Sequence, residues 1–169
     1  MMDRPLPHWL LAPDQNLILF TDGCALTNPG VGGWAFLLVA EGCPGEFARF
    51  GGLTHTTSVA AELIAAVRGL SILPADTAVQ LRTDSEILHR GLTEWLGRWR
   101  RNGWYNAAGK PVRNQHLWRR LDRLSRHREI DSVWVPGHSG VDGNERCDQL
   151  ARQAADQKQR ELLARSTWQ

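Results

Sequence analysis

The sequence predicts an α/β protein with a mixed, five-stranded sheet flanked by helices. Its first third contains three short apolar segments separated by turn residues, which is typical of an antiparallel meander. From residue 58 onward, helical periodicity alternates with two further strand-like segments, which favours parallel strands joined by helices. Strands are expected over residues 17–22, 33–39, 47–53, 78–84 and 130–136. Helices are expected over residues 58–72, about 85–101, 115 to about 127, and 142 to about 164.

A length of 169 residues favours one domain with a well-buried core, expected over residues 16–165. Residues 1–15 contain three prolines and are expected to form an irregular N-terminal extension. No apolar run is long enough to span a membrane, and the N-terminus does not have the pattern of a signal peptide. The three cysteines are far apart and form no C-x-x-C pair, which argues against disulfides and zinc and favours a reducing cytoplasm.

The first predicted strand ends in an acid. Alternation places Ile18, Phe20 and Asp22 on one face, and the opposite face is apolar as well. A strand that is apolar on both faces is expected to be central in the sheet. A carboxylate at the end of such a strand costs free energy unless a bound cation compensates it. Asp22 is therefore a candidate metal ligand.

Two further acids lie in the helix and the strand that follow the predicted meander. Thr57 or Ser58 is expected to cap the helix 58–72, and Glu62 borders its apolar stripe. Alone, Glu62 is better explained as an ordinary surface residue. The fourth strand ends in Asp84, just as the first ends in Asp22. Two acids that close two strands at the same sheet edge are typical of a site in an open α/β sheet.

Residues 90–128 form a basic segment of the chain. They contain eleven Lys/Arg and only two acids, a net charge of +9, and the rest of the chain carries −7. This asymmetry indicates contact with a polyanion, although a solvated helix surface would have the same composition. Ten of the eleven are Arg, the better phosphate ligand. Four Trp residues lie in the same region, and Trp95, Trp99 and Trp118 are expected to form a small core that supports a basic helical protrusion.

The C-terminal part of the chain adds a loop and a last helix. The loop over residues 137–143 contains three glycines and His138. Asp142 or Asn144 is expected to cap the helix, and Asp148 lies in its first turns, where acids are common. Together with the three earlier acids, Asp148 completes a set of four oxygen ligands without Cys or paired His. Such a set favours Mg²⁺ or Mn²⁺, and beside an Arg-rich surface it suits phosphodiester cleavage with two metal ions.

In order and spacing, the motifs resemble those of ribonuclease HI, the type 1 ribonuclease H family, from about residue 16 to 155. They are Thr21-Asp22-Gly23, Asn28-Pro29-Gly30, Gly32-Gly33, Glu62-Leu63, Ala65-Ala66, Thr83-Asp84-Ser85, Gly103-Trp104, Lys110-Pro111-Val112, Asn114, Leu117-Trp118, Trp134-Val135, Gly137-His138-Ser139-Gly140, Asn144-Glu145-Arg146-Cys147-Asp148 and Leu150-Ala151.

The resemblance implies an RNase H-like fold and an endoribonuclease that hydrolyses the RNA strand of RNA–DNA hybrids. It implies two Mg²⁺ ions, with Mn²⁺ as a substitute, 5′-phosphate and 3′-hydroxyl products, and a monomer that does not bind membranes. By motif, the metal-binding and catalytic acids are Asp22, Glu62, Asp84 and Asp148, and His138 assists proton transfer or product release. The substrate-binding residues implied in the same way are Asn28, Thr57, Trp95, Arg100, Arg101, Trp104 and Lys110.

The sequence departs from the family pattern at a few positions. Ser58 and Val59 stand where the family usually has two Asn that contact nucleic acid, and Glu86 replaces a frequent Gln. Asn102 stands where the protrusion often has another basic residue. These changes predict weaker or altered hybrid binding without loss of the chemistry, because all four acids are present. Two alternative functions remain open. One is a hybrid-binding module without catalysis, and the other is a relative that acts on DNA, such as a resolvase or integrase.

Overall fold

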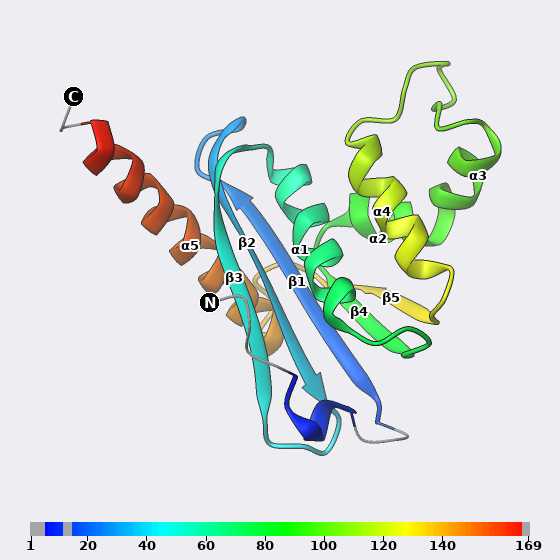
Figure 1. The fold of residues 1–169 in the computed structure, drawn as a ribbon, viewed down its shortest axis with the longest axis horizontal. Coiled ribbons are helices and arrows are strands. Elements are labelled where there is room, and N and C mark those ends of the chain that lie inside the picture. Colours follow the sequence, from blue (N-terminus) through cyan, green and yellow to red (C-terminus); the bar gives the residue numbers. More distant parts are fainter. Residues whose placement is uncertain (1–5, 12–14, 167–169) are drawn as a thin grey trace.

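The computed structural model describes residues 6–11 and 15–166 and contains a five-stranded sheet of order β3-β2-β1-β4-β5 (Figure 1). The strands are β1 (Leu17–Ala25), β2 (Gly30–Ala40), β3 (Glu46–Thr56), β4 (Val79–Thr83) and β5 (Ile130–Trp134). Strands β1, β2 and β3 form an antiparallel meander, and β4 and β5 continue the sheet in parallel with β1. The predicted mixed sheet is confirmed, with β1 at its centre.

Helices cover the two faces of the sheet. They are η1 (His8–Leu11), α1 (Ser58–Ile72), α2 (Glu86–Arg90), the π-helical turn η2 (Gly91–Trp95), α3 (Leu96–Arg101), α4 (Gln115–Ser125) and α5 (Asp142–Ser166). Helix α1 packs on β1 and β2 from one side, and α5 packs on β1, β2 and β3 from the other (Figure 1). Leu17 and Leu19 belong to the larger core cluster, whereas Phe20 packs with α5. The predicted alternation of β1 is therefore confirmed, and Asp22 lies on the α5 face.

The described helices include none that is both long and apolar enough to cross a bilayer. At the N-terminus the chain is not wholly irregular, because η1 forms a short 3-10 helix and Leu10 is buried in the core. The rest of the predicted extension, residues 1–5 and 12–14, lies outside the described residues.

The basic segment forms a protrusion of α2, η2, α3 and α4 beside the sheet (Figure 1). Its single predicted first helix is interrupted by η2, where a π-helical turn accommodates an extra residue. The Trp99 ring packs on Trp95 and Trp118 at centroid distances of 5.5 and 5.2 Å, so the predicted aromatic core is present. Asn114 occupies the position before α4 with a left-handed backbone (φ 54°), and its side chain makes no capping hydrogen bond.

Several arginines of the protrusion serve the fold. Asp122, only 1% exposed, accepts hydrogen bonds from Arg100 and Arg126 and thereby ties α3 to α4. Arg128 donates to the carbonyl oxygens of Leu70 and Leu73 at the end of α1, and burial lowers its pKa. Among the described residues, six basic side chains of the segment are exposed and make no hydrogen bond or ion pair: Arg98, Arg101, Lys110, Arg113, Arg120 and Arg123.

Candidate metal and nucleic-acid site

The end of β1 brings Asp22 and Glu62 together. A side chain at Gly23 would place its Cβ 2.2 Å from the backbone carbonyl carbon of Ala61, so only glycine lets α1 approach β1 this closely. This contact lies next to Glu62, the residue after Ala61 in the first turns of α1. The amide of Gly23 also donates to Oδ1 of Asp22 over 2.7 Å and fixes the orientation of that carboxylate.

Asp84 joins these two acids from the neighbouring strand. It directly follows β4, which runs parallel to β1 with Arg82 opposite Phe20. This register places Asp84 level with Asp22, although β1 does not end there as predicted but continues to Ala25. One carboxylate oxygen each of Asp22, Glu62 and Asp84 can be chosen so that all three lie within 4.8 Å of one another. We call these residues the three-acid cluster. Three of the four predicted acids thus converge.

Without a counter-charge, the ionised form of the three-acid cluster is energetically unfavourable. Burial, with a contribution from Asp84, raises the pKa of Asp22 from 3.8 to about 6. Burial and the neighbouring acids also raise the pKa of Glu62 well above its usual value, and Oε2 of Glu62 is enclosed without a donor. Such a group must hold protons or a cation. Its all-carboxylate donors fit a hard divalent cation such as Mg²⁺ or Mn²⁺.

The fourth predicted acid, Asp148, stands apart from this cluster. Helix α5 begins directly on β1, because a Cβ at Gly143 would lie 2.4 Å from the Phe20 ring. Asp148 follows in the first turns of α5 but is not among the three convergent acids. Instead, its Oδ1 accepts a hydrogen bond from Nε of Arg152 over 2.7 Å. The predicted four-acid site is therefore assembled only in part in this structure.

Asn144 lies in the site, and sequence reasoning considered it only as a helix cap. It is 2% exposed, and its Nδ2 donates to Oδ2 of Asp84 over 3.3 Å. Its Oδ1 is buried and has no partner among the described residues. Asn144 precedes Asp148 by four residues and so shares its helix face, a spacing that could have indicated its position.

The loop after β5 also begins at the site. Gly137 packs against Asp84, since a Cβ there would lie 3.0 Å from Oδ2 of Asp84. The next residue, His138, is exposed and has a left-handed backbone (φ 53°). The indole of Trp134 donates to the backbone oxygen of Asp84 over 3.0 Å, a contact that the sequence did not indicate. His138 therefore sits on an exposed loop anchored beside one of the three acids.

The predicted substrate contacts divide into two groups. Asn28, Thr57 and Trp95 line one pocket of about 640 Å³ between the sheet and the protrusion. We call this pocket the protrusion groove. Its other lining residues are Pro29, Val59, Ile87, Trp99, Asn106, Val112, Arg113, Asn114 and Trp118.

The other four predicted contacts do not line the protrusion groove. Trp104 is only 6% exposed and packs in the core, with Arg119 stacked on its ring, so a direct substrate contact by its ring is not supported. Arg100 is engaged by Asp122. Arg101 and Lys110 are exposed.

The amino-acid sequence is similar to that of known nucleases. The RNase H family model matches residues 14–156. A ribonuclease H of Pseudomonas fluorescens is 45% identical over 139 residues, which cover 82% of this chain and 91% of the relative. A ribonuclease H of Halorhodospira halophila is 48% identical over 140 residues, with coverage of 82% and 91%. The chain belongs to the ribonuclease H family.

Solved structures agree on the ribonuclease H fold. LC9-RNase H1, described as a type 1 RNase H with the type 2 active-site motif, gives a TM-score of 0.74 at 24% identity, covering 87% of this chain and 75% of that one. LC11-RNase H1 in complex with RNA/DNA hybrid gives a TM-score of 0.66 at 24% identity, covering 84% and 98%. Together with the named relatives, these likenesses support a nuclease with a ribonuclease H fold.

The positions that depart from the ribonuclease H pattern have visible roles here. The amide of Ser58 donates to Oδ1 of Asn28 over 3.3 Å, which links the start of α1 to the β1–β2 loop. Val59 gives the protrusion groove an apolar wall. Glu86 forms an ion pair with Arg90 at 3.6 Å, so its additional negative charge is partly compensated. The departures therefore change the groove and leave the three-acid cluster intact.

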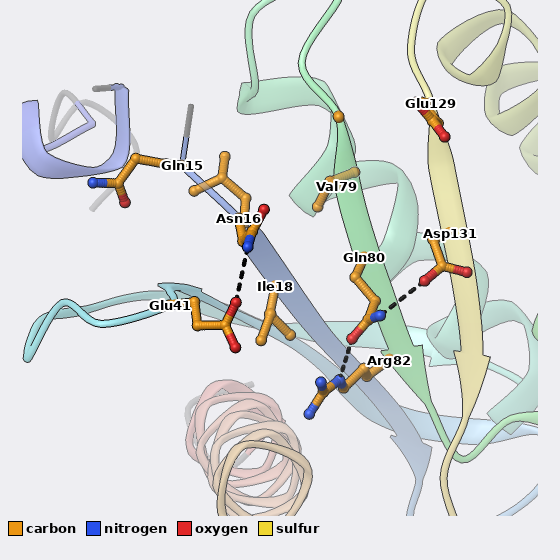
Figure 2. A pocket seen from close by; sticks show the side chains of 11 residues that line it. Gln15, Asn16, Ile18, Glu41, Val79, Gln80, Arg82, Glu129 and Asp131 are labelled. Atoms are coloured by element: carbon orange, nitrogen blue, oxygen red, sulfur yellow. Dashed lines mark hydrogen bonds between the residues drawn. The ribbon is translucent and has the colours of Figure 1, made fainter. Parts of the chain in front are cut away.

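A second pocket, of about 360 Å³, lies at the opposite ends of β1 and β4 (Figure 2). Its polar side chains largely satisfy one another. Arg82 donates to Gln80 over 2.7 Å, and Gln80 donates to Asp131 over 2.8 Å (Figure 2). Because these groups are paired and lie away from the three acids, this pocket is not the candidate active site.

Replacing Asn144 with Ala is expected to lower kcat for hybrid cleavage by roughly 10-fold, because groups that orient metal ligands typically contribute that much. The substrate KM should change little, since Asn144 is buried beneath Asp84. Steady-state kinetics on a labelled hybrid measure both constants. Gln153→Ala, an exposed change on the same helix, is the matched control. An unchanged kcat in Asn144→Ala would show that its bond to Asp84 has no role in the reaction.

Proposed function

We propose that the protein is an endoribonuclease that hydrolyses the RNA strand of RNA–DNA hybrids with two divalent cations. The products would carry 5′-phosphate and 3′-hydroxyl ends. The observation that carries this proposal is the convergence of the Asp22, Glu62 and Asp84 carboxylates within 4.8 Å. Membership of the ribonuclease H family, and a fold shared with LC11-RNase H1 in its hybrid complex, support the choice of substrate.

The three-acid cluster would hold the cations, with Asp148 as the fourth ligand after it turns toward them. Mg²⁺ is the proposed ion and Mn²⁺ a substitute, because all the donors are carboxylate oxygens. Bound as a pair, such ions would supply a water of lowered pKa as nucleophile and stabilise charge on the leaving 3′ oxygen. Asn144 and Trp134 would keep Asp84 in place through its side chain and its backbone.

His138 would handle a proton or assist product release. It is an imidazole, the side chain best suited to proton exchange near neutral pH. Its loop starts against Asp84 and its side chain is exposed, so it can reach a phosphate held at the acids.

The protrusion groove would hold the hybrid through its backbone. Thr57 already accepts a hydrogen bond from the amide of Ala60, and its hydroxyl proton remains available to a phosphate oxygen. Exposed cations of the protrusion would add phosphate contacts without base specificity. Minor-groove width and 2′-hydroxyls would distinguish the RNA strand from the DNA strand. We also propose a monomer acting in a reducing cytoplasm, consistent with free Cys24, Cys43 and Cys147.

The test compares end-labelled RNA–DNA hybrid, duplex RNA and duplex DNA in Mg²⁺ and in Mn²⁺. Cleavage is expected in the RNA strand of the hybrid alone, with 5′-phosphate products. Binding of hybrid without cleavage in either metal would favour a hybrid-binding module. Cleavage of duplex DNA would favour a relative that acts on DNA.

Replacing Arg101 and Lys110 together with Ala is expected to raise KM for hybrid several-fold and leave kcat nearly unchanged. Loss of two phosphate contacts should reduce the slope of log KM against log salt by about 1 to 2. Kinetics at several salt concentrations measure this slope. Arg100→Ala is the comparison, because Arg100 is paired with Asp122 and its loss should mainly lower protein stability. An unchanged slope in the double variant would place the phosphate contacts elsewhere.

A further inference from the structure

Asp148 is held by an arginine of its own helix. Nε of Arg152 donates to Oδ1 of Asp148 over 2.7 Å, one helical turn further along α5. The Asp148 side chain is 22% exposed, whereas the Arg152 side chain is 60% exposed. This bond uses one of the two carboxylate oxygens and raises the pKa of Arg152.

This ion pair lies at the margin of the three-acid cluster. Asp148 is close enough for its charge to contribute to the raised pKa of Asp22. Arg152 and Asp148 both act on the pKa of the Cys24 thiol, two residues beyond Asp22 on the same strand. Yet Asp148 offers no oxygen within the shared 4.8 Å range of the other three acids. The Asp148 carboxylate therefore lies near the three-acid cluster but is bound to the guanidinium of Arg152.

We propose that Arg152 competes with a divalent cation for the Asp148 carboxylate and thereby sets the cation concentration at which the site fills. The inference rests on the proposed function, because it takes Asp148 as the fourth metal ligand. For Asp148 to join the three-acid cluster, its side chain must turn, and the hydrogen bond to Arg152 must lengthen or break. Arg152 is thus a positioning residue that acts through Asp148.

The expected effect is modest because the pair is partly exposed. An ion pair between side chains four residues apart on a helix surface is weak and screened by salt. Its loss should therefore change the dissociation constant of the cation by roughly two- to five-fold. This size suits adjustment of the cation requirement and leaves the chemistry intact.

The experiment measures Mn²⁺ binding to the full-length protein without nucleic acid, by electron paramagnetic resonance of free Mn²⁺. It compares wild type, Arg152→Gln, Arg152→Lys, Asp148→Asn and the double variant Arg152→Gln with Asp148→Asn. Arg146→Gln is the matched control, because Arg146 is also an exposed α5 arginine in an ion pair, with Glu46 at 3.8 Å. It removes the same charge from the same helix.

Arg152→Gln is expected to tighten Mn²⁺ binding by about two- to five-fold, with Arg152→Lys closer to wild type. The same change should have little effect in the Asp148→Asn background, and Arg146→Gln should leave Mn²⁺ binding close to wild type. An equal change in both backgrounds would show that only the charge of Arg152 matters and would overturn the proposal. Unchanged or weaker binding in Arg152→Gln would overturn it as well.

The outcome also separates this inference from the proposed function. A wild-type protein that binds Mn²⁺ and cleaves hybrids, but shows no coupling between Arg152 and Asp148, would contradict the inference alone. A wild-type protein that neither binds Mn²⁺ nor cleaves hybrids would contradict both.

Discussion

Asp84→Asn is expected to reduce hybrid cleavage by roughly a thousand-fold or more, because stabilisation by bound cations is worth several kcal/mol and each 1.36 kcal/mol is tenfold in rate. Asp84 lies where two parallel strands end, and it is the member of the three-acid cluster that Asn144, Trp134 and Gly137 all contact. The amide keeps the shape of the side chain but removes the charge that a cation needs. Single-turnover cleavage of a labelled hybrid measures the loss.

Hybrid binding by Asp84→Asn should remain within a few-fold of wild type, as measured by a gel shift without divalent cations. Asp131→Asn provides the control, because Asp131 is an exposed acid at the distant pocket and should keep full activity. Substantial cleavage by Asp84→Asn would contradict the assignment of Asp84 as a metal ligand. Loss of binding together with cleavage would indicate damage to the groove.

Asp22→Asn is expected to stabilise the metal-free protein at neutral pH by about 1–3 kcal/mol, judged from the size of its pKa shift. Burial and Asp84 raise the pKa of Asp22 from 3.8 to about 6, so the folded state binds a proton that the unfolded chain releases. The free energy of unfolding should therefore fall as pH rises from about 4 to 6, and stay lower above this range. Because Asn cannot ionise, the Asp22→Asn variant should not lose this part of the free energy of unfolding.

Urea unfolding of the metal-free proteins at several pH values tests the sign. Wild type should lose stability through this window, whereas Asp22→Asn should lose less, and Mn²⁺ at pH 8 should restore stability to wild type more than to the variant. Asp156→Asn, an exposed acid of α5, is the control. A lower stability of Asp22→Asn than of wild type at pH 8 would contradict the predicted repulsion among the buried acids.

The fold and the three-acid cluster could be predicted because their signals are local. Helix α1 begins at Ser58 as predicted, because the Thr57 side chain accepts a hydrogen bond from Ala60 and caps it. Asp22 and Asp84 each follow an apolar run of a strand, and the parallel register of β1 and β4 places them level with each other. The predicted strand end at Asp22 was wrong, because β1 stays paired with β2 as far as Ala25. Helix-capping residues and the alternation of apolar side chains along strands were therefore sufficient to predict most of the fold.

Side-chain partners across the fold could not be predicted in the same way. Asp122 binds Arg100 from a different helix, and Asn144 reaches Asp84, 60 residues earlier in the chain. No sequence periodicity indicates which of the eleven basic residues will pair with the buried Asp122. The motif implied that Trp104 contacts the substrate, but its side chain is buried. A Trp after a chain reversal can either pack in the core or face a ligand, and the sequence does not distinguish these two cases.

The most direct measurement of the central claim is anomalous scattering from Mn²⁺ in crystals of the protein. The carboxylates of Asp22, Glu62 and Asp84 are predicted to bind Mn²⁺, because they converge and, among the described residues, none of them forms an ion pair with a basic side chain. A second ion is predicted when hybrid is bound, with Asp148 turned away from Arg152. Mn²⁺ density absent from these acids, at concentrations that support hybrid cleavage, would contradict the account.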